Sequence, residues 1–188
     1  MKLAIHRDPL IRAVAQAQSV VERRNTIPIL ANVLIEAEGD TVSFRATDLD
    51  IEVVDTAPAK IDRAGATTVP AVTFHDIVRK LPDGALVTMT DDSAAGRLSV
   101  EAGRSSFQLQ TLPREDFPIM ASTEYTSNFS APAPLLRRLF DKSKFAISTE
   151  ETRYYLNGVY MHVADRSGGQ VLRCVATDGH RLARIDAD

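Results

Sequence analysis

Three stretches of the chain carry apolar residues at intervals of three and four, the spacing of an amphipathic helix. This pattern predicts helices over residues 9–21 and 72–81 and from Pro134 onward. Asp8 is expected to cap the first helix and Pro9 to begin it, because both suit a helix start. The residues at helical spacing are Leu10, Val14, Ala17 and Val21 in the first stretch, Phe74, Ile77, Val78 and Leu81 in the second, and Leu135, Leu136, Leu139 and Phe140 in the third.

Most of the remaining sequence alternates apolar and polar residues, which is typical of strands with one buried face. The alternation is clearest over residues 41–46, 97–101 and 107–110. Turns that contain glycine separate the strands, for example at residues 38–40 and 166–169. The pattern therefore predicts half-buried antiparallel strands.

The chain also repeats itself. Each copy is expected to contain a strand, a helix and three further strands, and the stretch from residue 66 to residue 112 has the same order. Superposing the copies should align Pro9 with Pro134 and Thr47 with Thr177. The matching segments are 8–14 with 133–139, 32–37 with 158–163, and 42–53 with 172–183.

These repeats predict an α+β fold of β-α-β-β-β units, with two helices packed on antiparallel sheets in each domain. Residues 1–120 are expected to form one complete domain, residues 121–127 a linker, and residues 128–188 the first half of a second domain. A lone unit leaves a sheet edge and an apolar face uncovered. We therefore expect the chain to be part of a longer protein.

Composition narrows the class of protein. The chain is 44% hydrophobic and 25% charged, which is ordinary for a globular protein. No stretch approaches the roughly 18 to 20 apolar residues that span a bilayer, and Cys174 is the single cysteine. These features predict a cytoplasmic protein with no disulfide framework and no membrane partner.

Charge is distributed unevenly. The helical segments with their flanks, residues 7–24, 72–81 and 133–145, carry a net +6, which leaves −9 for the rest of a chain whose total is −3. If the helices share one face, that face is basic and suits a phosphate backbone. The alternative is that these are ordinary solvated helix faces.

Two acidic motifs are the best candidates for catalysis or metal binding. Asp48 and Asp50 lie in TDLD, and Asp178 and His180 lie in TDGH at the corresponding place in the repeat. Such groups suit Mg²⁺ binding or proton transfer. A structural turn is the favoured interpretation, because aspartate and glycine are turn residues and the second copy replaces one carboxylate by histidine. Cys174 lies in an apolar run and is expected in the core rather than as a nucleophile.

The segment Arg153-Tyr154-Tyr155-Leu156 combines a cation with two adjacent aromatic rings. Such residues can stack on bases and contact phosphate. The alternative is the start of an aromatic strand. Consecutive strand residues point to opposite faces, so at least one tyrosine is expected to be exposed.

The whole chain resembles the N-terminal half of the bacterial DNA polymerase III beta subunit, the sliding clamp. The resemblance implies that each subunit has three similar domains and that two subunits close a ring around duplex DNA. Helices would line the hole and sheets would form the outside. It implies no catalytic activity, no metal and no cofactor. The motifs that carry it are RNTIPILANVLIEA (24–37), ATDLDIEV (46–53), TTVPA (67–71), TLPREDFP (111–118), RYYLNG (153–158) and VATDGHRLA (175–183).

The resemblance also implies roles for individual residues. The implied partners are duplex DNA, a second subunit, and short linear peptides of the DNA polymerase III catalytic subunit and the clamp loader. DNA-contacting residues are Arg24, Arg79, Arg137, Arg138 and Tyr154. One wall of the peptide pocket comprises Arg153, Tyr155, Leu156, Thr177, Gly179, His180, Arg181 and Leu182. The edge that pairs with another subunit comprises Arg104, Phe107 and Leu109.

Two alternatives stay open at this point. One is an Mg²⁺-dependent enzyme that hydrolyses phosphodiesters through Asp48 and Asp50. The other is a peptide-binding module without a DNA role. The alternative for Leu156 and Leu182 of the peptide pocket is that they fill the core of the sheet. The family's third domain is not expected within these 188 residues, so the opposite wall of the pocket and the ring-closing surface are expected to lie elsewhere.

Overall fold

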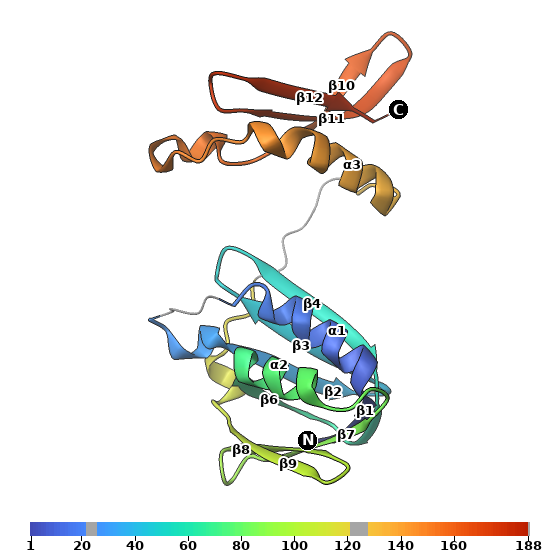
Figure 1. The fold of residues 1–188 in the computed structure, drawn as a ribbon, viewed down its shortest axis with the longest axis vertical. Coiled ribbons are helices and arrows are strands. Elements are labelled where there is room, and N and C mark those ends of the chain that lie inside the picture. The colour runs from blue at the N-terminus through green and yellow to red at the C-terminus, as the bar shows by residue number, and fades with distance from the viewer. Residues whose placement is uncertain (22–25, 121–127, 188) are drawn as a thin grey trace. The chain divides into compact units, whose positions relative to one another are not determined.

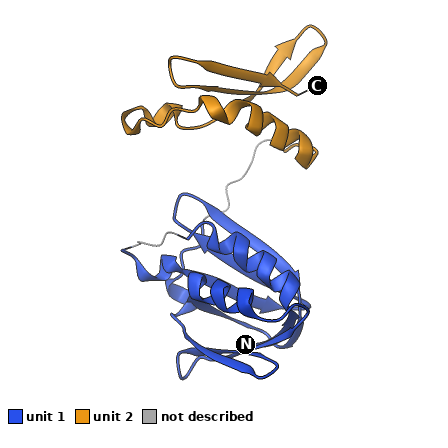
Figure 2. Cartoon of the chain, viewed as in Figure 1, with its two compact units in different colours: residues 1–122 blue, residues 123–188 orange. Residues whose placement is uncertain are grey.

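The computed structural model describes residues 1–21, 26–120 and 128–187. The chain divides into two compact units, Met1–Ser122 and Thr123–Asp188 (Figure 2). We call them the first and the second unit and describe each by itself.

In its described residues, the first unit contains two antiparallel sheets and two α-helices (Figure 1). The four-stranded sheet has the order β4-β3-β2-β6, and the five-stranded sheet has the order β5-β1-β7-β8-β9. The helices are α1 (Arg7–Gln18) and α2 (Ala71–Lys80). The strands are β1 (Lys2–His6), β2 (Asn32–Glu38), β3 (Thr41–Thr47), β4 (Glu52–Pro58), β5 (Lys60–Arg63), β6 (Gly65–Pro70), β7 (Leu86–Asp92), β8 (Arg97–Ala102) and β9 (Ser105–Gln110).

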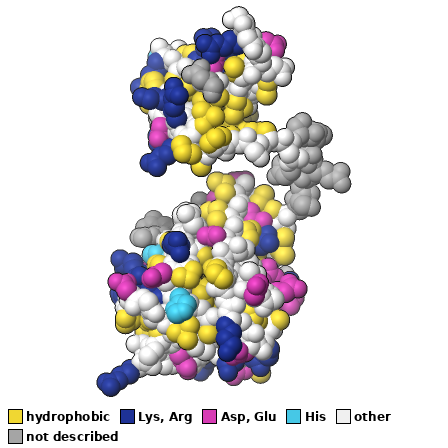
Figure 3. All heavy atoms as spheres, turned by 90° about the vertical axis from the view of Figure 1, so that its right-hand side faces the viewer, with side chains coloured by type: hydrophobic (Ala, Val, Ile, Leu, Met, Phe, Trp, Pro, Cys, Tyr) yellow, Lys and Arg dark blue, Asp and Glu magenta, His cyan; other side chains and the backbone are white. Residues whose placement is uncertain are grey.

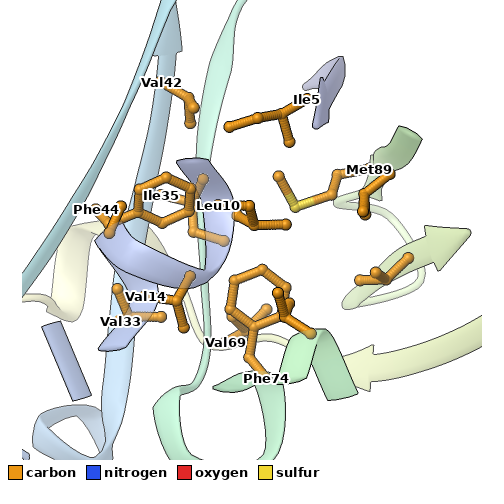
Figure 4. Packing of buried hydrophobic residues seen from close by; sticks show 14 of the residues in the cluster. Ile5, Leu10, Val14, Val33, Ile35, Val42, Phe44, Val69, Phe74 and Met89 are labelled. Atoms are coloured by element: carbon orange, nitrogen blue, oxygen red, sulfur yellow. The ribbon is translucent and has the colours of Figure 1, made fainter. Parts of the chain in front are cut away.

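Both sheets and both helices share one hydrophobic core. Leu10 of α1 and Phe74 of α2 lie between Phe44 of β3 and Met89 of β7, and all four side chains are fully buried (Figure 4). Burying a side chain of this size stabilises a fold by about 1.5–3 kcal/mol. The apolar faces predicted for the first two helices are therefore the faces that pack on the sheets.

The first helix begins earlier than its sequence pattern predicts. Strand β1 runs directly into α1, and the amide of Arg7 donates a hydrogen bond to the carbonyl of Ala85. Asp8 and Pro9 consequently lie inside the first turn, so the prediction that Asp8 caps the helix is wrong. Both residues remain compatible with that place, because an acidic side chain suits the positive end of a helix and proline lacks an amide that the first turn would leave unpaired.

The first unit also contains a strand that the sequence pattern did not predict. After Pro58 the chain leaves the four-stranded sheet, and β5 pairs with β1 at the edge of the five-stranded sheet. Ile61 is the single apolar residue in KIDR. A strand of four residues with one apolar position shows too little alternation to be recognised.

The second unit packs one helix on a three-stranded sheet with the order β10-β11-β12. Its core is small and centres on Ala146, Ala176 and Ala183. Cys174 is fully buried, as predicted, and burial raises the pKa of its thiol. The elements are α3 (Ala133–Ser143), β10 (Tyr160–Arg166), β11 (Gly169–Thr177) and β12 (Leu182–Asp186).

The repeat is confirmed where the two units correspond. Pro9 and Pro134 lie in the first turns of α1 and α3, and Thr47 and Thr177 end β3 and β11. The predicted strand before the third helix is absent from the described residues 128–132. No helix within the described ranges is long and apolar enough to cross a membrane.

The RYYL segment lies in η4 (Glu151–Leu156), two short 3-10 turns that meet at a kink at Arg153, rather than at the start of a strand. Its side chains therefore do not alternate between two faces as those of a strand do. Tyr154 and Tyr155 are both exposed. The other 3-10 helices are η1 (Pro28–Ala31), η2 (Arg114–Asp116) and η3 (Lys144–Ala146).

Candidate functional site

The TDLD and TDGH motifs form the same turn in the two units. Oδ1 of Asp48 accepts hydrogen bonds from the amides of Asp50 and Ile51, at 2.9 and 2.7 Å. Oδ1 of Asp178 accepts the equivalent bonds from His180 and Arg181, both at 2.9 Å. The preference for a structural turn is confirmed, because each carboxylate is engaged by its own backbone.

The residue after each aspartate has a left-handed backbone. Leu49 has φ +82° and Gly179 has φ +89°. The hydroxyl of the preceding threonine accepts the amide of this residue in both units, at 3.0 and 3.1 Å. Glycine adopts such a backbone without strain, whereas a leucine does so at a cost.

The hydrogen bonds also fix the charge of both carboxyl groups. Bonds from the amides of Ile51 and Asp50 lower the pKa of Asp48. The amides of His180 and Arg181 and the Arg181 guanidinium lower the pKa of Asp178 to about 2. Both groups are charged acceptors held by the turn. Within the part of the chain that the structure describes, no three His, Cys, Asp or Glu residues gather into a possible metal site.

The turn at Asp178 lies against η4, which brings two separate parts of the predicted peptide pocket together. Nη1 of Arg153 lies 3.5 Å from the carbonyl oxygen of Asp178. A Cβ on Gly179 would approach Nη1 of Arg153 to 3.1 Å, so the absence of a side chain leaves room for the guanidinium. Nε of Arg153 also pairs with Oε2 of Glu150 at 3.1 Å.

The remaining pocket residues present a mixed apolar and basic surface. Leu182 is 65% exposed, which excludes the interpretation that it fills the sheet core. Leu156 is half-buried, as is Thr177, whose hydroxyl donates to the carbonyl of Arg181. Tyr155 and His180 are exposed.

Phe145 is a neighbour of this surface that the sequence did not identify. The guanidinium of Arg181 lies over its ring at 5.8 Å from the centroid, and Nε of Arg181 pairs with Oδ2 of Asp178 at 2.8 Å. Phe145 is itself exposed. No sequence pattern pointed to Phe145, because its contact with Arg181 depends on where the turn of residues 178–181 lies in the structure.

Three of the predicted DNA-contacting residues lie at exposed positions of the helices. Arg137 and Arg138 project from α3 and Arg79 from α2. Arg79 pairs with Asp76 at 3.3 Å, and Arg137 with Asp141 at 3.6 Å. Such exposed pairs contribute about 0–1 kcal/mol, so a phosphate can replace the carboxylate.

Two further predicted DNA residues complete this set. Tyr154 is 79% exposed and meets Tyr155 edge-on, with ring centroids 5.9 Å apart. Arg24 lies outside the described residues.

In the second unit, Lys and Arg side chains gather on one side and a hydrophobic patch lies beside them (Figure 3).

The predicted subunit edge is the free side of β9. Among the described strands, β9 pairs with β8 alone and ends the five-stranded sheet. Arg104, in the preceding turn, and Phe107 are exposed. Leu109, in the same strand, is only 5% exposed and packs in the core of the first unit. Phe107 instead borders a hollow of about 330 Å³ beside Ile77 of α2.

Comparisons with known proteins agree with this geometry. The family model "DNA polymerase III beta subunit, N-terminal domain" matches residues 1–121, and the model of its central domain matches residues 131–187. The chain is 56% identical over 183 residues to the beta sliding clamp of Caulobacter vibrioides, and the alignment covers 97% of this chain and 49% of that protein. It is 42% identical over 190 residues to the beta sliding clamp of Pseudomonas aeruginosa, and that alignment covers 100% of this chain and 50% of that protein.

Solved structures give the same result. A Caulobacter crescentus beta sliding clamp superposes with a TM-score of 0.93 at 54% identity, over 99% of this chain and 50% of that one. A Bartonella birtlesii sliding clamp bound to griselimycin superposes with a TM-score of 0.93 at 47% identity, over 99% of this chain and 49% of that one. The chain spans about half the length of the curated relatives it matches. With both family domains matched in order and the α+β clamp fold confirmed, this chain belongs to the DNA polymerase III beta subunit family.

Proposed function

We propose that this chain acts within a sliding clamp, a non-catalytic ring that encircles duplex DNA and tethers the replicative polymerase to its template. The observation that carries the proposal is the exposed basic surface of the helices on a fold that matches sliding clamps over 99% of the chain. The alternative of an Mg²⁺-dependent enzyme lacks support, because Asp48 is engaged in its own turn.

Exposed arginines suit a protein that must hold DNA without stopping on any sequence. Guanidinium groups on α2 and α3 can contact phosphates, which carry no sequence information. A closed ring supplies retention through topology, so each individual contact can stay weak. Arg79 and Arg137 can exchange their ion pairs with Asp76 and Asp141 for contacts with phosphates. Such weak contacts fit this requirement better than tight base-specific bonds.

The second part of the proposal concerns partners. We infer that the surface formed by η4 and the turn of residues 177–181 is one wall of a pocket for short linear peptides of the polymerase and the clamp loader. Exposed Leu182 and half-buried Leu156 offer apolar contact, and Arg153 and Arg181 offer hydrogen-bond donors. Extended peptides commonly bind through such alternating anchors.

The free edge of β9 is the proposed surface for a second subunit. A strand edge offers unpaired backbone groups to a strand of another chain. Arg104 and Phe107 would frame that contact, and Leu109 would support it from within the core.

A charge-reversal experiment tests the DNA role. A chimaera in which residues 1–187 replace the matching half of the Caulobacter vibrioides relative is titrated with duplex DNA at several salt concentrations by fluorescence anisotropy. Arg137→Glu with Arg138→Glu should weaken binding and lower the log-log salt slope by about 1 for each lost phosphate contact. Arg97→Glu with Lys60→Glu, on exposed strand positions, is the control with the same change in charge. An equal loss in both variants would show that only net charge matters, and an unchanged slope in the α3 variant would remove these residues from the DNA-facing surface.

A further inference from the structure

We propose that Asp178 is a positioning residue of the peptide-binding wall, because one side chain holds both the turn and the guanidinium of Arg181. The inference rests on the proposed peptide-binding function and extends it to a residue that does not itself present an apolar or basic contact.

Asp178 makes separate contacts with its two carboxylate oxygens and its carbonyl. Oδ1 accepts the amides of His180 and Arg181 and fixes the turn. Oδ2 lies 2.8 Å from Nε of Arg181. The carbonyl oxygen faces Nη1 of Arg153 at 3.5 Å. A single residue therefore connects both arginines of the wall to one hydrogen-bonded turn.

Phe145 is a second neighbour of the Arg181 side chain. The guanidinium pairs with the carboxylate of Asp178 and lies over the ring of Phe145, 5.8 Å from its centroid. A side chain that is already oriented loses less conformational freedom when a partner binds. Arg153 is restrained in a comparable way by Glu150 and by the carbonyl of Asp178.

The first unit supplies an internal comparison. Asp48 makes the same two backbone bonds, yet no ion pair to an arginine is found for it in the described residues, and Leu49 replaces the glycine. Of the contacts made by the aspartate side chain, those of Oδ1 are therefore common to both turns. The additional Oδ2 contact and the space beside Gly179 are what the second unit adds, and both act on arginines of the proposed pocket.

Two variants separate the roles of Asp178. Asp178→Asn keeps an oxygen that accepts the two amides but removes the charge that holds Arg181. Asp178→Ala removes both. Asp48→Asn is the matched control, since it makes the same change in the equivalent turn of the first unit. All three are made in the 188-residue chain.

The first measurement is the ¹H–¹⁵N heteronuclear NOE of the arginine Nε–H groups and of the turn amides. In Asp178→Asn, Arg181 Nε–H should become mobile while the amides of His180 and Arg181 stay ordered. In Asp178→Ala, the amides and Arg153 Nε–H should become mobile as well. Asp48→Asn should leave all of these signals unchanged. An Arg181 Nε–H that is equally ordered in the wild-type chain and in Asp178→Asn would overturn the proposal.

The second measurement is binding of griselimycin and of a synthetic linear peptide with Leu and Phe anchors. The same variants are made for it in the chimaera with the Caulobacter vibrioides relative, because the opposite wall of the proposed pocket is expected in the other half of that protein. Asp178→Asn should weaken binding by about 2- to 12-fold, the range that corresponds to ordering one long side chain. Asp48→Asn should leave the affinity unchanged. Equal affinity of Asp178→Asn and the wild-type chimaera would also overturn the proposal. If neither probe binds the wild-type chimaera while Arg181 responds as expected in the chain alone, the positioning role stands and the proposed peptide-binding function fails.

Discussion

The hydroxyl of Thr68 connects the four-stranded sheet of the first unit to the segment that follows β9, and its removal gives a sharp test of how that unit is held together. Thr68, in β6 of the four-stranded sheet, is fully buried. Its Oγ1 accepts Nδ2 of Asn32 at 3.0 Å and the amide of Leu112 at 3.1 Å, and donates to the carbonyl of Leu112 at 2.8 Å. Leu112 follows β9 of the five-stranded sheet, so these bonds fix the chain where the proposed subunit edge ends.

Thr68→Val preserves the shape of the side chain and removes all three hydrogen bonds. Asn32 is only 4% exposed, so water cannot replace the lost partner of its amide, and a buried polar group left unpaired costs about 1–3 kcal/mol. Leu112 is more exposed, and its backbone groups can regain water. We therefore expect a loss of about 1–3 kcal/mol in the free energy of unfolding. Thr68→Ser keeps the hydroxyl and removes one methyl group, which costs about 1 kcal/mol.

The assay is urea denaturation followed by far-UV circular dichroism, with ¹H–¹⁵N spectra to assign the transition to the first unit. The valine variant should show a lower midpoint with an unchanged m-value, and the serine variant should lie between it and the wild-type chain. If the valine variant were as stable as the serine variant, the stabilising contribution would come from packing, and the reasoning from the hydroxyl would be refuted.

Three further predictions follow from the burial and pairing of single residues. Leu109→Ala should cost about 2–5 kcal/mol of stability as a core deletion, and the more exposed Phe107→Ala less, measured by the same denaturation; the reverse order would contradict the placement of these side chains. Cys174 should react with a thiol reagent only as urea opens the second unit, because burial shields the thiol and raises its pKa, and fast reaction in native buffer would be inconsistent with that burial. Asp186 pairs with Arg173 at 2.7 and 2.9 Å, and the bond lowers the pKa of Asp186. Asp186→Asn should therefore lower the melting temperature at pH 7, and its difference from the wild-type chain should shrink as the pH falls below the ordinary carboxyl value of 3.8; a difference that is the same at pH 7 and pH 2.5 would contradict the linkage.

The sequence by itself determined the repeat, the helices and the class of fold. Apolar spacing of three and four requires a helix that faces a core, and alternation requires a half-buried strand, so both are visible without any long-range contact. Thr47 and Thr177 could be matched for the same reason, because a threonine-aspartate turn closes through bonds to its own backbone. The exact start of α1 could not be read, since a hydrogen bond to Ala85 decides it.

Only the tertiary structure decided which residues meet. Arg153 and Asp178 are 25 positions apart, and their contact depends on how η4 packs against the turn. The same holds for Phe145 beside Arg181. Phe107 and Leu109 lie two positions apart in the same alternating strand. Leu109 is nevertheless covered by the core, whereas Phe107 borders a hollow beside α2. Local pattern fixes which face of an element is apolar, whereas the packing of other elements on that face decides which of its residues remain free for a partner.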